Sequence, residues 1–454
     1  MIVILGAGLA GLSAAYHLRE AGHDDFGLYE RQARPCGLAR SHRIGLYTFD
    51  HTGHFLHLRD PAIQRLVSDW LGERLPEVRR SSWIFSHGVY THYPFQTNTY
   101  GLPVDIVKEC ILGYIRARYE KVELPNEPLD EPELPKPQYS FEQWIYENFG
   151  SGIAKHFMIP YNDKLWGIHP RYMTATWMGR FVPPAPIDAV LEGALTDKTA
   201  NVGYNATFRY PVEGGIETFA KELARRAGHI HCGHDAVEID TRKRRVKFAS
   251  GETIPYETLV STIPLPQLCA RLNPVQEDVR EACAKLKWSS VFAVNLGLRV
   301  DRTEGRHWAY VPERQYSFYR AGCFSNAARA MAPAGHSSVW VETSYNAQRP
   351  LDRQKARAGA IAGLKAMGWL RDDRDIAAEW LLEIPCAYVT FDACHAEATK
   401  TIHQYLERHN ICSTGRFGRW EYSSMEDAII HGRTVAARLV GTNEDTTVPS
   451  AELK

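Results

Sequence analysis

The chain has few of the features that mark a nucleic-acid-binding or membrane protein. Its 454 residues carry 53 Lys and Arg against 53 Asp and Glu, so the formal net charge is zero, and no long basic block is present. This balance gives no reason to expect a nucleic acid or an anionic membrane surface as a partner. No apolar run is long enough to cross a bilayer, and the first apolar strand follows Met1 directly, which leaves no room for a signal peptide. We therefore expect a soluble, cytoplasmic protein without a membrane span.

Metal-ligand and disulfide patterns are also missing. The nine cysteines form neither a C-x-x-C pair nor a Cys/His set at metal-binding spacing. They are typical of small buried hydrophobic residues in a reducing compartment, so no metal site and no disulfide framework is predicted. With 44% hydrophobic and 23% charged residues, and without internal repeats, the chain can bury a large core and should divide into two or three lobes.

A glycine-rich turn near the N-terminus is the most informative feature that is present. Gly6, Gly8 and Gly11 follow the apolar run Ile2–Leu5, and Glu30 ends a second short apolar run. Glycines at these positions allow a tight turn and let backbone N–H groups approach a pyrophosphate at the positive end of a helix, while the acid can bind a ribose hydroxyl. The pattern predicts a dinucleotide-binding βαβ unit. The alternative is a chance glycine turn in an unrelated α/β protein.

The next segment decides between dinucleotides. Arg34–Ser41 stands where FAD enzymes of the amine-oxidase type carry a Gly-Gly-x-x-x-Ser/Arg turn, so FAD is favoured over NAD. Gly37, Leu38 and Arg40 are the residues expected at the cofactor. Cys36 occupies the usual place of the first glycine, so the backbone there must either avoid positive φ or tolerate strain.

The predicted fold class is α/β, with a discontinuous Rossmann-like FAD-binding domain, a helical lobe, and a mixed α/β lobe with an antiparallel sheet. Two later segments return to the FAD domain: a hairpin that begins near Val237 and leads into a strand at 258–264, and a strand at 410–414 followed by Gly415 and a helix at 426–439. The proline-rich stretch 124–137 is expected to be a surface excursion. The expected division is 1–85, 205–264 and 396–440 for the FAD-binding domain, 100–204 for a helical lobe that binds substrate and nucleotide, 86–99 and 265–395 for a sheet-containing substrate lobe, and 441–454 for a flexible tail.

Four further segments combine aromatic, amide and arginine side chains. They are 93–96, 157–166, 205–211 and 308–320. Flat rings can stack on a base, amides can read its edge, and arginine can clamp a phosphate with two hydrogen bonds. Each segment taken alone is more typical of core packing.

In order along most of the chain, these segments resemble the UDP-galactopyranose mutases, most of all their eukaryotic-type members, within the fold shared by amine oxidases and protoporphyrinogen oxidases. Asp50–His54 resembles that family's Asp-x-Gly-Gly-His loop beside the flavin. The other matching motifs are Tyr93–Gln96, Pro160–Asn162 with Lys164 and Trp166, Asn205–Arg209, Phe318–Arg320 with Phe324–Asn326, and Gly415–Gly418 with Trp420 and Tyr422.

The resemblance implies an isomerase that converts a nucleotide-diphosphate sugar between pyranose and furanose forms, by default UDP-galactopyranose to UDP-galactofuranose, for cell-wall or glycan biosynthesis. Reduced FAD would act covalently: its N5 attacks the anomeric carbon, the nucleotide diphosphate leaves, and the N5–sugar adduct opens and recloses with the other ring size, without net redox. An external reductant, NAD(P)H or another donor, would reduce the FAD. The oligomeric state is left open, with a homo-oligomer as one option.

The resemblance also implies a role for particular residues. Arg320 would clamp the diphosphate with help from Tyr388 and Tyr422, His54 would lie beside the flavin, and Asn205 would reach the sugar; Arg416 would touch an FAD phosphate. The implied catalytic residues are His54, Arg320 and Asn205; the substrate-binding residues are Tyr93, Gln96, Phe157, Asn162, Trp166, Trp308, Tyr310, Tyr388 and Tyr422; and the cofactor-binding residues are Gly6, Gly8, Gly11, Glu30, Gly37, Leu38, Arg40, Gly53, Val237, Gly415, Arg416 and Met425.

Two departures from the family pattern concern the substrate. Phe181 stands where the family has an arginine that faces phosphate or sugar, and Ala327 replaces a tyrosine that binds the diphosphate. The loss of one charge-assisted hydrogen bond would cost about 1.5–3 kcal/mol. Two alternatives remain: a redox enzyme of the amine-oxidase or protoporphyrinogen-oxidase type, and a flavin protein that binds a nucleotide sugar without catalysis. The sequence leaves the sugar, the nucleotide and the electron donor open.

Overall fold

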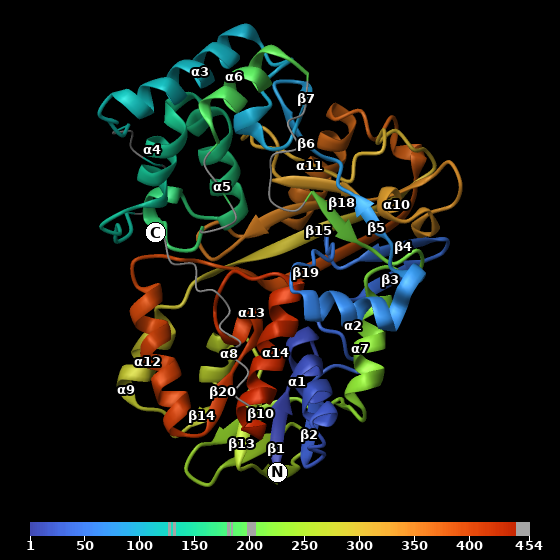
Figure 1. Ribbon diagram of the computed structural model, residues 1–454, viewed down its shortest axis with the longest axis vertical. Coiled ribbons are helices and arrows are strands. Elements are labelled where there is room, and N and C mark those ends of the chain that lie inside the picture. The colour runs from blue at the N-terminus through green and yellow to red at the C-terminus, as the bar shows by residue number, and fades with distance from the viewer. Residues whose placement is uncertain (126–128, 130–132, 179–181, 183–184, 198–205, 442–454) are drawn as a thin grey trace.

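The base of the molecule is a five-stranded parallel sheet in the order β20-β13-β1-β2-β9 (Figure 1). The computed structural model describes residues 1–125, 129, 133–178, 182, 185–197 and 206–441. Because the strands come from segments far apart in the chain, the sheet confirms the discontinuous Rossmann-like unit predicted from the glycine turn. The bounds are β1 Ile2–Leu5, β2 Phe26–Glu30, β9 His231–Cys232, β13 Thr258–Ser261 and β20 Ile411–Ser413.

Helix α1 follows β1 and packs against both α7 and α14. Glycine permits the contact with α14, because a Cβ at Gly432 would lie 2.4 Å from the carbonyl oxygen of Ala10. Helix α14 begins with a capping box between Ser424 and Asp427, which satisfies backbone N–H groups at its start. The first and last helices therefore belong to one domain. The bounds are α1 Leu9–Glu20, α7 Glu217–Ala227 and α14 Met425–Val440.

The hairpin expected from Val237 onward is present, because β10 and β11 pair antiparallel. They belong to a four-stranded sheet in the order β12-β11-β10-β14. A disulfide joins Cys269 to Cys283, 14 residues apart in sequence. The expectation of unpaired cysteines is wrong for this pair, because the chain turns back through β14 and brings α8 against α9. The bounds are β10 Ala236–Asp240, β11 Arg245–Phe248, β12 Thr253–Pro255, α8 Leu265–Cys269, β14 Leu272–Asn273, α9 Glu277–Ala284 and α12 His395–Arg408.

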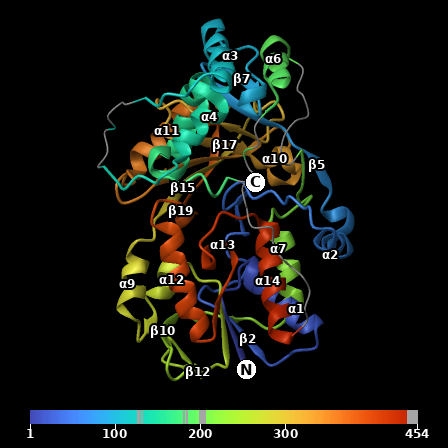
Figure 2. The same ribbon diagram turned by 60° about the vertical axis from the view of Figure 1, so that its left-hand side comes forward.

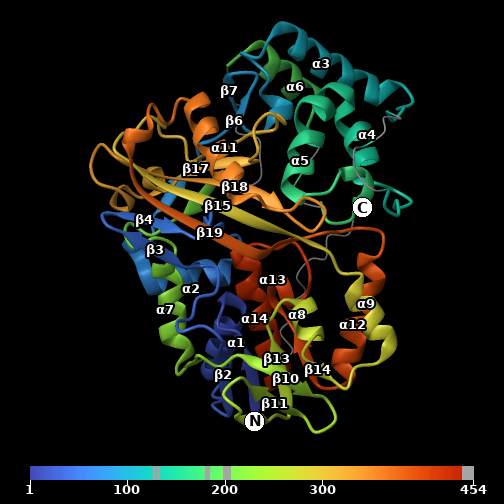
Figure 3. The same cartoon turned by 180° about the vertical axis from the view of Figure 1, so that it is seen from behind.

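A seven-stranded sheet forms the second layer, in the order β19-β15-β18-β17-β16-β6-β7 (Figure 3). Helix α11 covers one face, where Val294, Val341 and Ala360 share a core. Side chains alternate along a strand, so Glu342, the residue after Val341, points to the opposite face. Strand β6 crosses the boundary expected at residue 85 and pairs within this sheet. The bounds are β6 Ser82–Ser86, β7 Val89–His92, β15 Trp288–Leu298, β16 Trp308–Tyr310, β17 Arg320–Cys323, β18 Ser337–Tyr345, α11 Arg353–Ala366 and β19 Ile376–Val389.

A group of helices lies at the end of the molecule opposite the parallel sheet (Figure 2). Helices α3 and α4 pack closely, since a Cβ at Gly152 would lie 2.2 Å from the carbonyl oxygen of Glu109. A π-helical turn, η3, connects α4 to α5, which carries Asn162 and Trp166. In the proline-rich stretch, 126–128 and 130–132 lie outside the described residues, as does the expected tail after Gly441. The bounds are α3 Val104–Tyr119, α4 Phe141–Ile153, η3 Ala154–Met158, α5 Ile159–Trp166 and α6 Ile187–Leu195.

Short elements connect these layers. Strands β3 and β4 pair antiparallel, and so do β5 and β8. Within the described ranges, no helix is long and apolar enough to cross a membrane. The bounds are β3 Ser41–Ile44, β4 Tyr47–Asp50, α2 Pro61–Leu71, η1 Gly72–Arg74, β5 Glu77–Arg79, η2 Phe95–Thr97, η4 Pro170–Tyr172, β8 Thr207–Arg209, α10 Phe324–Ala327, η6 Arg329–Met331, η7 Asp373–Asp375 and α13 Gly415–Gly418.

A buried histidine between these elements should make the fold sensitive to acid. The Nδ1 of His307 accepts a hydrogen bond from the Ser81 N–H at 2.8 Å, and burial lowers the pKa of this imidazole from 6.5 to about 4. The stabilisation is complete above the unfolded pKa and is lost as the pH falls toward the folded one, because the unfolded state then binds more protons. The wild type should therefore lose unfolding free energy as the pH falls from neutral to the folded pKa, and in His307→Gln this loss should be about 3 kcal/mol smaller.

Chemical denaturation at several pH values measures this difference. The matched control is His229→Gln, because His229 is exposed. An equal pH dependence in His307→Gln and the wild type would contradict the assignment.

Candidate functional site

One cavity of about 750 Å³ joins the glycine turn to the aromatic residues of the upper layers. Of the predicted site residues, Gly11, Arg40 and Val237 do not line it, and Asn205 lies outside the described residues. The predicted residues that do line it are Gly6, Gly8, Glu30, Gly37, Leu38, Gly53, His54, Tyr93, Gln96, Phe157, Asn162, Trp166, Trp308, Tyr310, Arg320, Tyr388, Gly415, Arg416, Tyr422 and Met425.

The glycine end of the cavity fits a dinucleotide. Gly6 has a φ of 97°, and a Cβ at Gly11 would lie 1.9 Å from the carbonyl oxygen of Gly6, so Gly11 serves the turn itself. Gly8 caps α1 without a side-chain hydrogen bond, which leaves the first N–H groups of the helix for a phosphate. The Glu30 carboxylate accepts hydrogen bonds from the N–H groups of Ala7 and Gln32, both at 2.9 Å, and retains lone pairs for a ribose hydroxyl.

In the loop after β2, the backbone of Cys36 has a positive φ, which is the strained one of the two conformations expected from the sequence. This residue has a φ of 85°, and its N–H donates to the Ala7 carbonyl at 2.8 Å. Burial raises the pKa of its thiol to about 12, so the thiol stays neutral. A Cβ at Gly37 would come within 3.0 Å of the Gly8 Cα. The loop thus lies directly against the glycine turn.

Two residues that were predicted to bind the cofactor, Arg40 and Val237, do not line the cavity. The Arg40 guanidinium donates to the carbonyl of Pro35 at 2.7 Å and to the carbonyl of Arg34, so it braces the loop. Val237 is 44% exposed. Its neighbours Asp235 and Ala236 line the cavity instead.

The opposite end of the cavity is aromatic. Phe157 stacks between Phe95 and Tyr161, with ring centroids 5.0 and 5.2 Å away. Trp166 donates to the Oδ1 of Asn162 at 3.1 Å, which fixes the orientation of that amide. The Gln96 side chain is 7% exposed and makes no hydrogen bond to the rest of the described chain. A buried amide in this position suits the polar edge of a base.

Arg320 lies beside this aromatic end. Its guanidinium donates to the Glu342 carboxylate at 2.8 and 3.0 Å through Nη2 and at 3.2 Å through Nε. Burial lowers the pKa of Arg320, but Glu342 more than offsets this effect, and the pKa is raised above its ordinary value. Burial raises the pKa of Tyr422 to about 12. Its phenol therefore stays neutral at ordinary pH.

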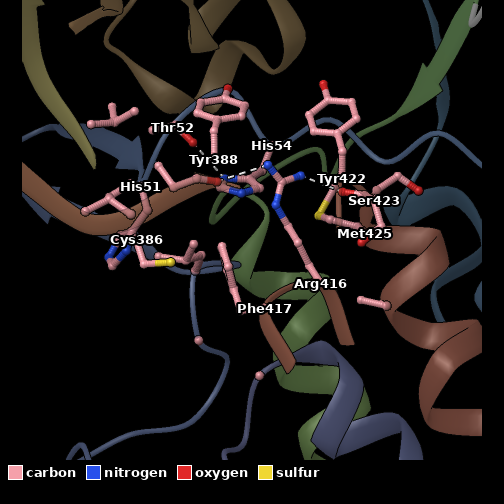
Figure 4. A pocket seen from close by; sticks show the side chains of 18 of the residues that line it. His51, Thr52, His54, Cys386, Tyr388, Arg416, Phe417, Tyr422, Ser423 and Met425 are labelled. Carbon is pink, nitrogen blue, oxygen red and sulfur yellow. Dashed lines mark hydrogen bonds between the residues drawn. The ribbon is translucent and has the colours of Figure 1, made fainter. Parts of the chain in front are cut away.

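His54 and Arg416 approach each other where the two layers meet (Figure 4). Burial lowers the pKa of His54 to about 4, so its imidazole is neutral. Arg416 donates to the carbonyl of Ser423 at 2.6 Å. Its guanidinium carbon lies 5.3 Å from the Tyr388 ring centroid and 4.9 Å from that of Tyr422. These contacts place Arg416 among the tyrosines expected at the substrate.

The structure adds residues that the sequence analysis left unassigned. Tyr161 and Glu342 line the cavity, whereas Ala327 does not, and Phe181 lies outside the described residues. The sequence could have predicted Tyr161 as a cavity residue, because it lies one helical turn after Phe157 and so on the same helix face. No pattern in the sequence indicated Glu342, since it contacts Arg320 from a neighbouring strand of the sheet.

Comparisons with known proteins identify the family and the fold. The family model of flavin-containing amine oxidoreductases matches residues 9–440. A crystal structure of reduced UDP-galactopyranose mutase is similar with a TM-score of 0.89 and 28% identity, over 99% of this chain and 96% of the other. A putrescine oxidase double mutant has a TM-score of 0.65 at 16% identity, over 97% of this chain and 98% of the other. A fatty acid isomerase from P. acnes has a TM-score of 0.64 at 16% identity, over 96% of this chain and 98% of the other. The last two likenesses concern the fold alone.

Proposed function

Because the chain belongs to the family of flavin-containing amine oxidoreductases, we propose that it is an FAD-dependent mutase that interconverts the pyranose and furanose forms of a nucleotide-diphosphate sugar. UDP-galactopyranose is the first candidate, since the similar mutase is described as acting on it. FAD fits the cavity end formed by Gly6, Gly8 and Glu30. When bound and reduced, FAD supplies the nucleophile for the anomeric carbon.

One observation carries the proposal. Arg320 lies among cavity tyrosines whose hydroxyl groups can donate hydrogen bonds. Tyr161 and Tyr310 have ring centroids 5.2 Å apart, and those of Tyr388 and Tyr422 are 6.2 Å apart. A guanidinium and several hydroxyl groups in a buried cavity suit a diphosphate, whose oxygens accept charge-assisted hydrogen bonds. An amine offers no matching acceptors, because it is itself a cation and a hydrogen-bond donor.

The chain's own residues can support such a reaction in three ways. Arg320 can hold the leaving diphosphate close to the sugar, so that it returns after the ring has changed size. Neutral His54 can accept or donate a hydrogen bond without adding a positive charge. The surrounding rings exclude water, which protects an activated sugar from hydrolysis.

The proposal is tested by turnover under anaerobic conditions. Dithionite-reduced protein should convert UDP-galactopyranose, or one other sugar in a panel of nucleotide sugars, to its furanose form, as resolved by chromatography. The oxidised protein is the control and should give no product, because the nucleophile is missing. Absence of product from every sugar, together with oxygen consumption in the presence of amines or porphyrinogens, would replace the mutase by an oxidase.

A further inference from the structure

Glu342 is a buried carboxylate at the point where Arg320 meets the loop that carries His54. It lies on β18 directly opposite Arg320 on β17, and it has no exposed surface. Besides Arg320, it accepts hydrogen bonds from the Tyr319 hydroxyl at 2.5 Å and from the Trp340 Nε1–H at 2.9 Å. These donors hold the carboxylate in one orientation.

The contact between Glu342 and Arg320 uses one edge of the guanidinium. Nε and Nη2 donate to the carboxylate, whereas Nη1 makes no hydrogen bond to the described part of the chain. Because the five N–H donors of a guanidinium lie in one rigid plane, fixing one edge also fixes the direction of the other. We propose that Glu342 is a positioning residue that holds the Nε–Nη2 edge of Arg320 and thereby presents Nη1 to the substrate diphosphate. This inference rests on the proposed function.

The same carboxylate also supports the loop of His54. The Gly53 N–H points to Oε1 of Glu342 at 3.4 Å. A Cβ at Gly53 would lie 2.7 Å from the Trp340 ring, so the loop backbone rests directly on this side chain. The loop and Arg320 therefore share one acceptor, and a shift of Glu342 displaces both.

A double-mutant cycle on UDP binding tests whether Glu342 acts through Arg320. Glu342→Gln keeps the size of the side chain but removes its charge and turns one acceptor into a donor. In the FAD-containing protein, we expect it to weaken UDP binding about tenfold or more by calorimetry, and Arg320→Met to weaken it at least as much. The double variant should bind UDP no more than about twofold more weakly than Arg320→Met alone, because the positioned group is already absent. The double variant also removes both buried charges together, which favours folding.

The control breaks a similar ion pair away from the cavity. Glu142 is 4% exposed and pairs with Arg171 at 2.9 Å, and Glu142→Gln should leave UDP binding unchanged. If Glu342→Gln does not fold, Glu342→Asp serves in the same cycle, since it keeps the charge but withdraws the carboxylate. The inference would be overturned if the Glu342 substitution weakened UDP binding by the same factor with and without Arg320, or did not weaken it at all. A wild-type protein that binds neither UDP nor any other nucleoside diphosphate would instead contradict the proposed function.

Discussion

Replacing Arg320 by alanine should lower nucleotide-sugar turnover about a thousandfold while FAD stays bound. Arg320 lies at the aromatic end of the cavity, away from the glycine turn, so its loss removes a buried cation from the diphosphate and leaves the end formed by Gly6, Gly8 and Glu30 in place. The effect should fall on kcat, because the charge on the leaving diphosphate grows as its bond to the sugar breaks. Turnover of the reduced protein and its visible flavin absorbance give the two readouts.

The alanine variant also leaves Glu342 without its charged partner. Breaking a buried ion pair from one side costs about 3–5 kcal/mol of stability, so a loss of turnover could reflect partial unfolding. Arg171→Ala provides the control, because it leaves the buried Glu142 in the same condition away from the cavity. Turnover should survive in Arg171→Ala at temperatures where both variants are folded. Near-normal turnover in Arg320→Ala would rule out its role as the diphosphate clamp.

The second large expected effect is a loss of FAD affinity when Gly8 in the glycine turn is replaced by alanine. A Cβ at Gly8 would meet only the Gly37 Cα, at 3.8 Å, and would otherwise point into open space of the cavity. The φ of −77° at Gly8 also suits alanine. Gly8→Ala should therefore change the unfolding free energy of the apoprotein by less than about 1 kcal/mol. It should weaken FAD binding at least about a hundredfold, because the methyl group stands where the backbone must approach the pyrophosphate.

Gly11→Ala separates the two roles of the glycines. Its Cβ would lie 1.9 Å from the Gly6 carbonyl oxygen, which is backbone and cannot move aside. This variant should therefore lose several kcal/mol of apoprotein stability as well as FAD. Titration of each apoprotein with FAD and denaturation without FAD measure the two quantities. Unchanged FAD affinity in Gly8→Ala would place the pyrophosphate elsewhere.

The features that could be predicted from the sequence are those whose physical cause is local. A tight turn after a buried strand needs glycine at fixed positions, so Gly6, Gly8 and Gly11 after the first strand, with Glu30 at the end of the second, predicted the end of the cavity that suits a dinucleotide. The aromatic end depended on a resemblance that extends along most of the chain, and its residues converge on one cavity; their individual roles remain predictions.

The remaining features depend on contacts between distant segments. Glu342 meets Arg320 only because β17 and β18 pair in one particular register, and nothing in the local sequence fixes that register. Arg40 was expected at the cofactor because it falls in the segment that matches the Gly-Gly-x-x-x-Ser/Arg turn of FAD enzymes. Loop carbonyl groups use its donors instead. The Cys269–Cys283 disulfide likewise follows from the packing of α8 on α9.

The strand order of the parallel sheet has a consequence for synthesis of the protein. The chain's first strand, β1, pairs with β13, which in turn pairs with β20, and β20 begins only at Ile411. Gly415 and Arg416, which complete the cavity wall, come later still. A ribosome-bound chain must therefore have been extended past Arg416 before FAD would have a complete pocket to enter. The glycine turn would thus remain without the opposite wall of its pocket while the whole chain from β2 to β20 is made.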